Sequence, residues 1–374
     1  MRETTTRALR LHGIHDLRVE TLPLAPPGPG EVQVAVERGG ICGSDLHYWH
    51  EGGVGTVRVI DPIVLGHEAG GRIVALGEGL GEDAGALAAG DRVAINPSHP
   101  CGACAYCLAG VPNQCAAMRF LGSAYRRPHE DGAFRDRINV AAANVVPLRR
   151  ASAAAAACAE PLSVCLHAAS RGPDLAGARV LVTGAGPIGA LMAAVARRAG
   201  AAEVAVTDIV PEPLVVARRM GATRTLDVAA EPDALDADKA DRGTFDVAFE
   251  CAGAAPAIRT AIEAVRPRGT IVQVGVAGDV PVPLNLLVSK EIAWRGTHRF
   301  HAEFAEAARL IDACGTDAGG TGAGATGAGG TGAGGIDVAP IVTATVPLER
   351  AAEAFPLAMD RRANVKVQIA FEAG

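Results

Sequence analysis

The stretch A-R-V-L-V-T-G-A-G-P-I-G-A-L-M at 178–192 decides the fold of this chain. The apolar run at 178–183 is typical of a buried strand, and a helical stretch begins directly after G-A-G-P-I-G. Glycines at this spacing between a strand and a helix allow the pyrophosphate of a dinucleotide to approach the helix N-terminus. We therefore expect a dinucleotide-binding turn made of Gly184, Gly186, Pro187, Ile188 and Gly189.

The same alternation of strand and helix continues beyond this turn. The pattern predicts strands at 203–208, 245–250 and 269–275, and helices that begin near Pro211 and cover 256–265. Strands that alternate with helices of this length are typical of a doubly wound parallel sheet, the Rossmann type of α/β fold.

Asp208 ends the second strand and is expected to accept hydrogen bonds from the adenosine ribose hydroxyls. A carboxylate at this place repels a 2′-phosphate, and Ile209 and Val210 bring no arginine beside it. The sequence therefore predicts NAD in preference to NADP, although Arg218 and Arg219 are near in sequence and leave NADP open.

The first 160 residues have a different, β-rich pattern. Val32, Val34 and Val36 alternate with other residues after a P-P-G-P-G turn, which is the period of a half-buried strand. Further short strands are predicted at 72–76 and 92–95, and again near the C-terminus at 338–345 and 365–371.

Composition excludes several classes of protein. The chain has 374 residues with 35 basic and 41 acidic side chains, a net charge of −6 and no long run of one sign. This balance disfavours a nucleic-acid-binding or membrane-binding surface. The first ten residues lack the apolar core of a secretory signal, so we expect a cytoplasmic protein without membrane or nucleic-acid partners.

Glycine is unusually frequent in one segment. Residues 315–335 form pentads such as G-T-G-A-G, and 11 of these 21 residues are glycine. Because no strand leads into the segment and it contains no lysine, we interpret it as a flexible surface insert rather than a phosphate-binding loop.

Four cysteines with the spacing C-x2-C-x2-C-x7-C predict a metal site: Cys101, Cys104, Cys107 and Cys115. Four thiolates on one short lobe can surround a Zn²⁺ ion tetrahedrally, and a site closed in this way is structural. An iron–sulfur cluster is the alternative, but the bacterial ferredoxin pattern continues with C-x3-C-P, which is absent here.

Further motifs give a family resemblance. C-G-S-D-L-H-Y-W from Cys42, G-H-E around His67, E-P-L-S-V from Glu160, the four-cysteine lobe and G-A-G-P-I-G follow one another in the order of the zinc-dependent medium-chain alcohol and polyol dehydrogenases. The chain resembles that family over nearly its whole length except the insert. Longer stretches at 38–48, 95–102, 113–124 and 296–300 resemble a branch that oxidises sugar acids.

The resemblance implies a domain plan of a Rossmann domain and a β-rich, GroES-like catalytic domain. The catalytic domain would comprise 1–161 and 299–374, the NAD-binding domain 162–298. It also implies two zinc ions per chain, a small sugar acid or polyol as substrate, and a homodimer or homotetramer.

The resemblance further implies the roles of individual residues. Cys42 and His67 would bind a catalytic zinc, with Glu160 or Glu68 as the carboxylate ligand. Ser44 would receive the substrate proton and His47 would pass it outward, while Asp45 would hold the free ring nitrogen of His67. The implied substrate residues are Tyr48, Arg119, Phe120, Arg299 and Phe300.

Three expectations remain to be compared with the structure. Lys366 is interpreted as a solvated surface residue. A sorbitol or xylitol dehydrogenase is the alternative enzyme, because it would keep the zinc and dinucleotide residues. A zinc-ribbon binding protein is the alternative that is not an enzyme, because it would need only the four-cysteine lobe.

Overall fold

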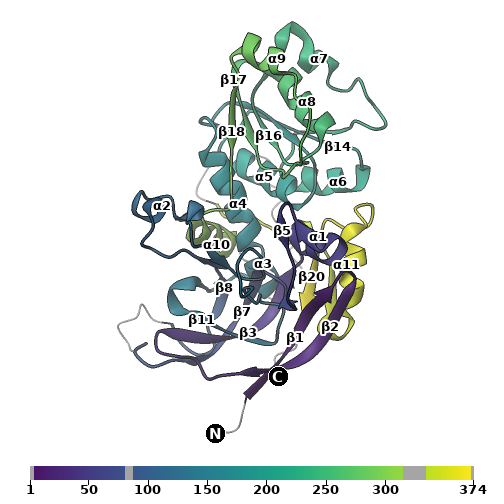
Figure 1. The fold of residues 1–374 in the computed structure, drawn as a ribbon. Coiled ribbons are helices and arrows are strands. Elements are labelled where there is room, and N and C mark those ends of the chain that lie inside the picture. Colours follow the sequence, from purple (N-terminus) through teal and green to yellow (C-terminus); the bar gives the residue numbers. More distant parts are fainter. Residues whose placement is uncertain (1–3, 81–86, 315–333, 372–374) are drawn as a thin grey trace.

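The computed structural model describes residues 4–80, 87–314 and 334–371, which form two lobes (Figure 1). The insert predicted at 315–335 lies outside the described residues except for its last two glycines. No helix in the described ranges is long and apolar enough to cross a membrane.

The upper lobe in Figure 1 is built on a six-stranded sheet in the order β15-β14-β13-β16-β17-β18, and every neighbouring pair is parallel. This confirms the predicted doubly wound sheet. The strands are β13 (Arg179–Thr183), β14 (Glu203–Asp208), β15 (Arg224–Asp227), β16 (Phe245–Glu250), β17 (Val265–Gln273) and β18 (Ala293–Gly296). The helices are α5 (Pro187–Arg198), α6 (Pro211–Arg219), α7 (Asp236–Lys239), α8 (Ala255–Ala264) and α9 (Leu284–Lys290).

The turn between β13 and α5 requires glycine for two different reasons. Gly184 has φ +91°, a left-handed conformation that favours glycine. At Gly189 a Cβ would lie 1.8 Å from the carbonyl oxygen of Gly184, so the helix and the strand approach too closely for any side chain. Pro187 follows as the first residue of α5, where its missing N–H costs no hydrogen bond.

The lower lobe is β-rich, as predicted, and its main sheet has seven strands. Six follow the order β12-β8-β7-β3-β20-β19, and β11 also pairs with β3. Strands from the C-terminal end of the chain therefore join strands from the N-terminal part. The strands are β3 (Glu31–Gly40), β7 (Glu68–Leu76), β8 (Arg92–Ile95), β11 (Arg137–Ala141), β12 (Val145–Leu148), β19 (Val342–Pro347) and β20 (Lys366–Ala370).

Smaller elements complete the lower lobe. Short sheets are formed by β1 (Thr4–Gly13), β2 (Asp16–Leu24) and β6 (Ile63–Val64), by β4 (Gly53–Val54) and β5 (Val57–Arg58), and by β9 (Ser98–His99) and β10 (Arg119–Phe120). Its helices are α1 (Gly43–Glu51), α2 (Ala105–Leu108), α3 (Ala153–Ala156) and α11 (Ala351–Met359). Single turns of 3₁₀ helix lie at Pro112–Gln114, Ala142–Asn144, Ala339–Ile341 and Leu348–Arg350, and a further one in the upper lobe at Ala240–Arg242.

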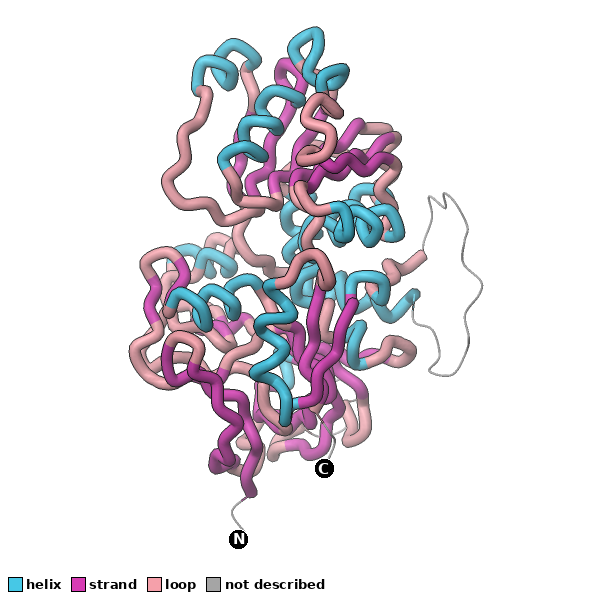
Figure 2. The backbone as a smooth tube through the Cα atoms, turned by 90° about the vertical axis from the view of Figure 1, so that its right-hand side faces the viewer, coloured by secondary structure: helices cyan, strands magenta, loops and turns pink. Residues whose placement is uncertain are grey.

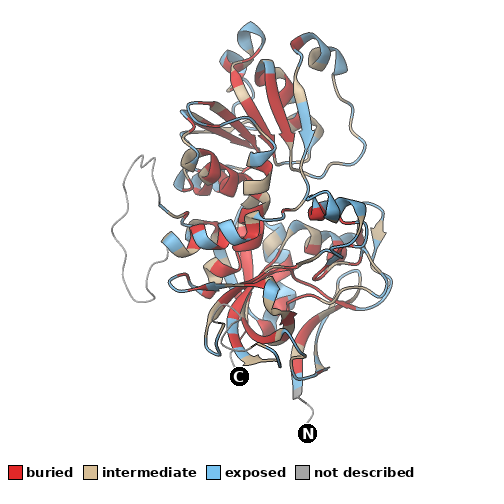
Figure 3. Cartoon of the chain, turned by 90° about the vertical axis from the view of Figure 1, so that its left-hand side faces the viewer, coloured by how far each residue is buried: buried red, intermediate tan, exposed pale blue. Residues whose placement is uncertain are grey.

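Helix α4 (Ala159–Ser170) connects the two lobes. It packs against α5 of the upper lobe and against α10 (Glu303–Cys314). The predicted domain boundary at residue 161 falls inside this helix. Figure 2 shows the helices and strands of both lobes from a second side. The buried residues follow the middle of each sheet and the inner face of α4 and α5, whereas the outer helix faces are exposed (Figure 3).

Candidate functional site

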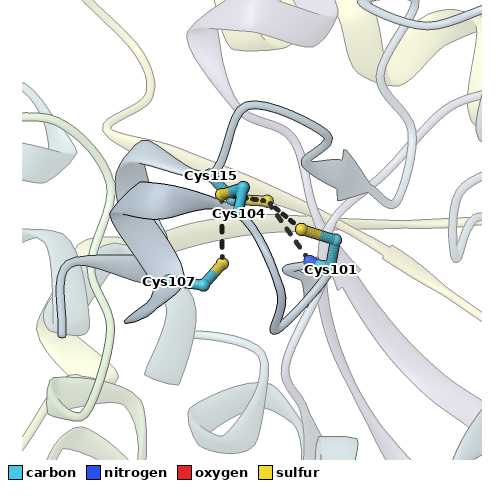
Figure 4. Close-up of side chains that lie close together, drawn as sticks. All are labelled: Cys101, Cys104, Cys107 and Cys115. Atoms are coloured by element: carbon cyan, nitrogen blue, oxygen red, sulfur yellow. Dashed lines mark hydrogen bonds between the residues drawn. The ribbon is translucent and has the colours of Figure 1, made fainter. Parts of the chain in front are cut away.

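The four predicted lobe cysteines converge in the structure. Figure 4 shows their side chains directed toward one another from the loop around α2. The sulfur–sulfur distances are 3.6 Å for Cys104–Cys107, 3.9 Å for Cys104–Cys115 and 3.5 Å for Cys115–Cys101. Sulfurs ~2.3 Å from a central zinc in a tetrahedron would lie ~3.8 Å apart, so the arrangement fits a Zn²⁺ ion.

Backbone amides around this lobe donate hydrogen bonds to the sulfurs of Cys115 and Cys104. The amide groups of Cys101 and Ala117 donate to the sulfur of Cys115, at 3.2 and 3.4 Å. Hydrogen bonds from the amides of Cys107 and Ala116 lower the pKa of the Cys104 thiol to about 6. A thiolate is the form that binds a metal, so this donor set suits a closed zinc site.

A second donor group is assembled by the pairing of β3 with β7. These antiparallel strands place Gly40 opposite Glu68, so the residues that follow β3 and precede β7 lie at the same end of the sheet. The sulfur of Cys42, a ring nitrogen of His67 and a carboxylate oxygen of Glu68 lie within 4.8 Å of one another. Glycine is required opposite Glu68, because a Cβ at Gly40 would lie 2.1 Å from a carboxylate oxygen.

The charges around His67 also suit a cation. Asp45 is fully buried, accepts from the amide of Cys42 at 2.9 Å, and lies 3.8 Å from Nδ1 of His67. Burial lowers the pKa of His67, but the negative charges of Asp45 and Cys42 raise it by more, to well above its usual value. A metal ion would supply the positive charge that these anionic groups favour.

Lys366 is buried beside this group, contrary to the interpretation as a solvated surface residue. Its Nζ donates to both carboxylate oxygens of Glu68, at 2.7 and 2.8 Å, and to the carbonyl oxygen of Ile41 at 3.1 Å. The two side chains are only 2% and 1% exposed. No local pattern in the sequence indicates this contact, because β20 pairs with β3 from the far end of the chain.

A cavity of about 660 Å³ opens beside the candidate metal centre. Apart from Cys115 of the four-cysteine lobe, the predicted residues that line it are Ser44, Tyr48, His67, Phe120, Glu160 and Arg299. Other described residues complete the wall, among them Asn113, Tyr125 and His298, which the sequence analysis did not single out. The cavity therefore joins the metal donors to an apolar wall and an arginine.

Glu160 enters the cavity from the first turn of α4 and is 6% exposed. Burial raises the pKa of this carboxyl to about 7, an effect that His67 opposes and Glu68 reinforces. Within the described residues, its carboxylate has no hydrogen bond or ion pair. It is therefore free to bind a metal or a proton in the cavity.

Arg299 is held in a defined position within the cavity. Its guanidinium lies over the ring of Phe120, 4.3 Å from the centroid, and its backbone adopts φ +54°. Burial lowers its pKa, although Glu160 opposes that effect. Across the described parts of the chain this guanidinium has no hydrogen bond or ion pair, so its donors remain available to a bound molecule.

Of the other predicted substrate residues, Tyr48 also lines the cavity, whereas Arg119 and Phe300 do not. The hydroxyl of Tyr48 accepts from the amide of Ala124 at 3.3 Å. Arg119 is exposed and pairs with Glu130, and Phe300 is buried against Phe304; neither lines the main cavity.

The predicted proton relay residue His47 lies on the outer face of α1. Its Nδ1 is 2.9 Å from the carboxylate of Glu51, and its side chain is 53% exposed. Its relay role stays a prediction.

Asp208 lies at the dinucleotide turn, as its place after β14 predicts. Its carboxylate accepts from the amide of Ala185 at 2.7 Å and from that of Ile209 at 2.7 Å. Arg361, from the C-terminal part of the chain, also donates to it at 2.6 Å. The sequence analysis did not identify Arg361, because it is 153 residues away along the chain.

Two family models match the chain. Residues 28–150 match the alcohol dehydrogenase GroES-like domain, and residues 187–313 match the zinc-binding dehydrogenase family. The first match covers the four lobe cysteines and the donor group of Cys42, His67 and Glu68, but not Glu160 or Lys366. The second covers most of the six-stranded sheet.

Individual relatives agree with these matches. The Escherichia coli (strain K12) protein L-idonate 5-dehydrogenase (NAD(P)(+)) is 40% identical over 342 residues, which are 90% of this chain and 91% of the relative. Sorbitol dehydrogenase of Macaca fascicularis is 35% identical over 355 residues, 93% and 91% of the two chains. The crystal structure of Escherichia coli L-idonate 5-dehydrogenase superposes with a TM-score of 0.86 and 36% identity, covering 99% of each chain.

We expect the change Cys104→Ala to remove one of two bound zinc ions per chain. A closed four-thiolate site that loses one ligand binds zinc much more weakly, and the lobe loses the stability that the metal provides. Metal analysis by inductively coupled plasma mass spectrometry, with thermal unfolding measured in parallel, checks this. The matched control is Cys314→Ala, because Cys314 is half-buried and belongs to neither donor group. A Cys104→Ala protein with the zinc content of the unmodified chain would contradict the assignment.

Proposed function

The chain belongs to the zinc-binding dehydrogenases that carry an alcohol dehydrogenase GroES-like domain, and we propose that it oxidises a secondary alcohol of a sugar acid with NAD(P). The specific reaction we propose is the interconversion of L-idonate and 5-keto-D-gluconate. The observation that carries the choice of a sugar acid is Arg299, the one arginine among the described residues that line the cavity.

Arg299 is suited to the carboxylate of such a substrate. A guanidinium presents a planar pair of N–H donors that matches a carboxylate, and the interaction strengthens where water is excluded. The ring of Phe120 fixes the plane of the guanidinium, and the left-handed backbone of Arg299 is a strain of ~1–3 kcal/mol that is typical of functional positions. Both features support a role in holding the substrate's carboxylate at a fixed distance from the metal donors.

The metal donors would act at the other end of the substrate. Cys42 and His67, with a carboxylate, would hold zinc, which when bound lowers the pKa of a substrate hydroxyl. Ser44 would accept the hydroxyl proton, and His47 would release it to solvent from its exposed position. A nicotinamide bound at the turn after β13 would supply the hydride acceptor, so that the alcohol and NAD⁺ would become the ketone, NADH and one proton.

We propose Glu160 as the carboxylate that completes the zinc ligands. Both oxygens of Glu68 already accept from Lys366, and the buried pair would have to separate before Glu68 could bind the metal. Glu160 has no such partner in the described structure and faces the cavity. Glu68 would instead support the site from behind, with Lys366 balancing its charge.

A polyol dehydrogenase acting on sorbitol or xylitol is the second candidate. Its support is the 35% identity to a sorbitol dehydrogenase over 93% of this chain. Such an enzyme would use the same metal and dinucleotide residues but would have no use for a carboxylate-binding arginine. The two candidates therefore differ in what Arg299 does.

We expect Arg299→Met to lower kcat/KM for L-idonate by about 10–100-fold, because a charge-assisted hydrogen bond contributes ~1.5–3 kcal/mol. For sorbitol, which has no carboxylate, the loss should be only a few-fold. Steady-state reduction of NAD⁺ and NADP⁺ with each substrate checks this. Arg119→Met is the matched control, because Arg119 is outside the cavity. Equal losses for both substrates, or a larger loss in the control, would show that Arg299 does not read the carboxylate.

We expect Glu160→Gln to weaken zinc binding at the open site by more than ~100-fold, because it removes a direct ligand, whereas supporting residues typically contribute about 10–100-fold. The comparison is the double variant Glu68→Gln, Lys366→Met, which removes the buried charge pair together and avoids leaving an unpaired buried charge. Release of zinc to a chromogenic chelator measures both. If the double variant lost zinc more readily than Glu160→Gln, the two carboxylates would have to exchange roles.

A further inference from the structure

Asp208, the acidic residue at the dinucleotide turn, forms an ion pair with Arg361 of the other lobe. Arg361 follows α11 in the C-terminal segment, and its Nη2 donates to Oδ2 of Asp208 over 2.6 Å. In Figure 1 this yellow segment lies directly below α6, at the edge of the upper lobe. Asp208 is buried, with a side chain only 2% exposed, whereas the side chain of Arg361 is 47% exposed.

The carboxylate of Asp208 is fully used in this arrangement. Its Oδ2 accepts from the amide of Ala185 as well as from Arg361. Its Oδ1 accepts from the amides of Ile209 and Val210, at 2.7 and 3.1 Å. The negative charge that would repel a phosphate beside it is therefore offset by a guanidinium in direct contact.

We propose that Arg361 determines the choice between NAD and NADP, by neutralising Asp208 and donating to the 2′-phosphate of NADP. The inference rests on the proposed function in one respect, that a dinucleotide binds at the turn after β13. It reverses the expectation of NAD over NADP, which counted only the residues next to Asp208 in sequence. With Arg361 in place, both dinucleotides are accepted.

The Arg361 guanidinium lies beside the carboxylate next to which the 2′-phosphate of NADP would bind. The acid at the end of the second strand of such a sheet receives the ribose 2′-hydroxyl, so a phosphate on that oxygen lies beside the acid. A guanidinium has several N–H donors, and the side chain of Arg361 uses one of them among the described residues. The remaining donors are on a half-exposed side chain and match the oxygens of a phosphate.

The nearer arginines are less suited to this role. Arg218 lies on α6 and donates to the carbonyl oxygen of Thr223 at 3.2 Å, and Arg219 is on the same helix with no hydrogen bond in the described structure. Neither contacts Asp208. Only Arg361, within the described residues, brings a cation to the carboxylate itself.

The test is the variant Arg361→Ala, with NAD⁺ and NADP⁺ titrated into the zinc-loaded enzyme by calorimetry in the absence of substrate. We expect NADP⁺ to bind about tenfold more weakly or worse, as for the loss of ~1.4 kcal/mol or more of charge-assisted hydrogen bonding. Binding of NAD⁺ should change by less than about threefold on the same scale, because the ribose hydroxyls can then use the freed oxygen of Asp208. Adenosine 2′,5′-bisphosphate and AMP, as competitors that carry only this half of the cofactor, should show the same contrast.

Two further variants make the result specific. Arg362→Ala removes the same charge from the adjacent residue, and should leave the ratio of the two affinities unchanged. Within the described structure, Arg362 forms no hydrogen bond or ion pair with Asp208. Arg361→Lys keeps the charge without the planar donor pair and should fall between the unmodified chain and Arg361→Ala. Unchanged binding of NAD⁺ in these variants shows that the turn is still folded.

Other outcomes would overturn the proposal. An equal loss of affinity for both cofactors would make Arg361 a contact between lobes without selectivity. Unchanged affinity for both would leave Arg361 without a role in recognition. If the unmodified chain bound NAD⁺ but not NADP⁺, this inference would fail while the proposed dehydrogenase function stood. If it bound neither, both would fail.

Discussion

The candidate metal centre depends on the register of three neighbouring strands, β7, β3 and β20. Antiparallel pairing places Gly40 opposite Glu68 on one side and opposite Gln368 on the other. The same register places Cys42 and His67 together at the ends of their strands. It also brings Lys366 into contact with Glu68. A shift of one residue would turn each of these side chains to the opposite face, so the sheet pairing specifies where Cys42, His67 and Glu68 lie.

The strand register also brings Glu68 and Lys366 together as a buried ion pair. Burying both charges costs desolvation free energy, which their close contact and the hydrogen bond to the carbonyl of Ile41 offset. The pair therefore contributes little net stability to the fold. Its effect is to fix where negative charge lies. With Glu68 balanced by Lys366, Glu160 is left as the buried carboxylate that faces the cavity and has no partner in the described structure.

Features that depend on residues close together in the sequence could be predicted, whereas contacts between residues far apart in the sequence could not. The doubly wound sheet and the β-rich lobe were predicted and are confirmed, because period and turn residues are local signals. The four lobe cysteines lie within fifteen residues, and their spacing alone implied that they converge. Lys366 was interpreted wrongly and Arg361 was missed, because both act on residues far away in the sequence. Arg119 and Phe300 occur in the motifs that suggested them, yet local packing directs both away from the cavity. The domain boundaries stay predictions, and the one at residue 161 falls inside helix α4.

The most direct test of this account is zinc K-edge X-ray absorption of the protein loaded with zinc. Two zinc ions per chain would share five thiolates, so the average zinc should have about 2.5 sulfur ligands, with nitrogen and oxygen completing the shell. A single zinc per chain with four sulfur ligands would contradict the two-zinc assignment, because Cys42 and His67 would then hold no metal and the three-strand register would build no second site.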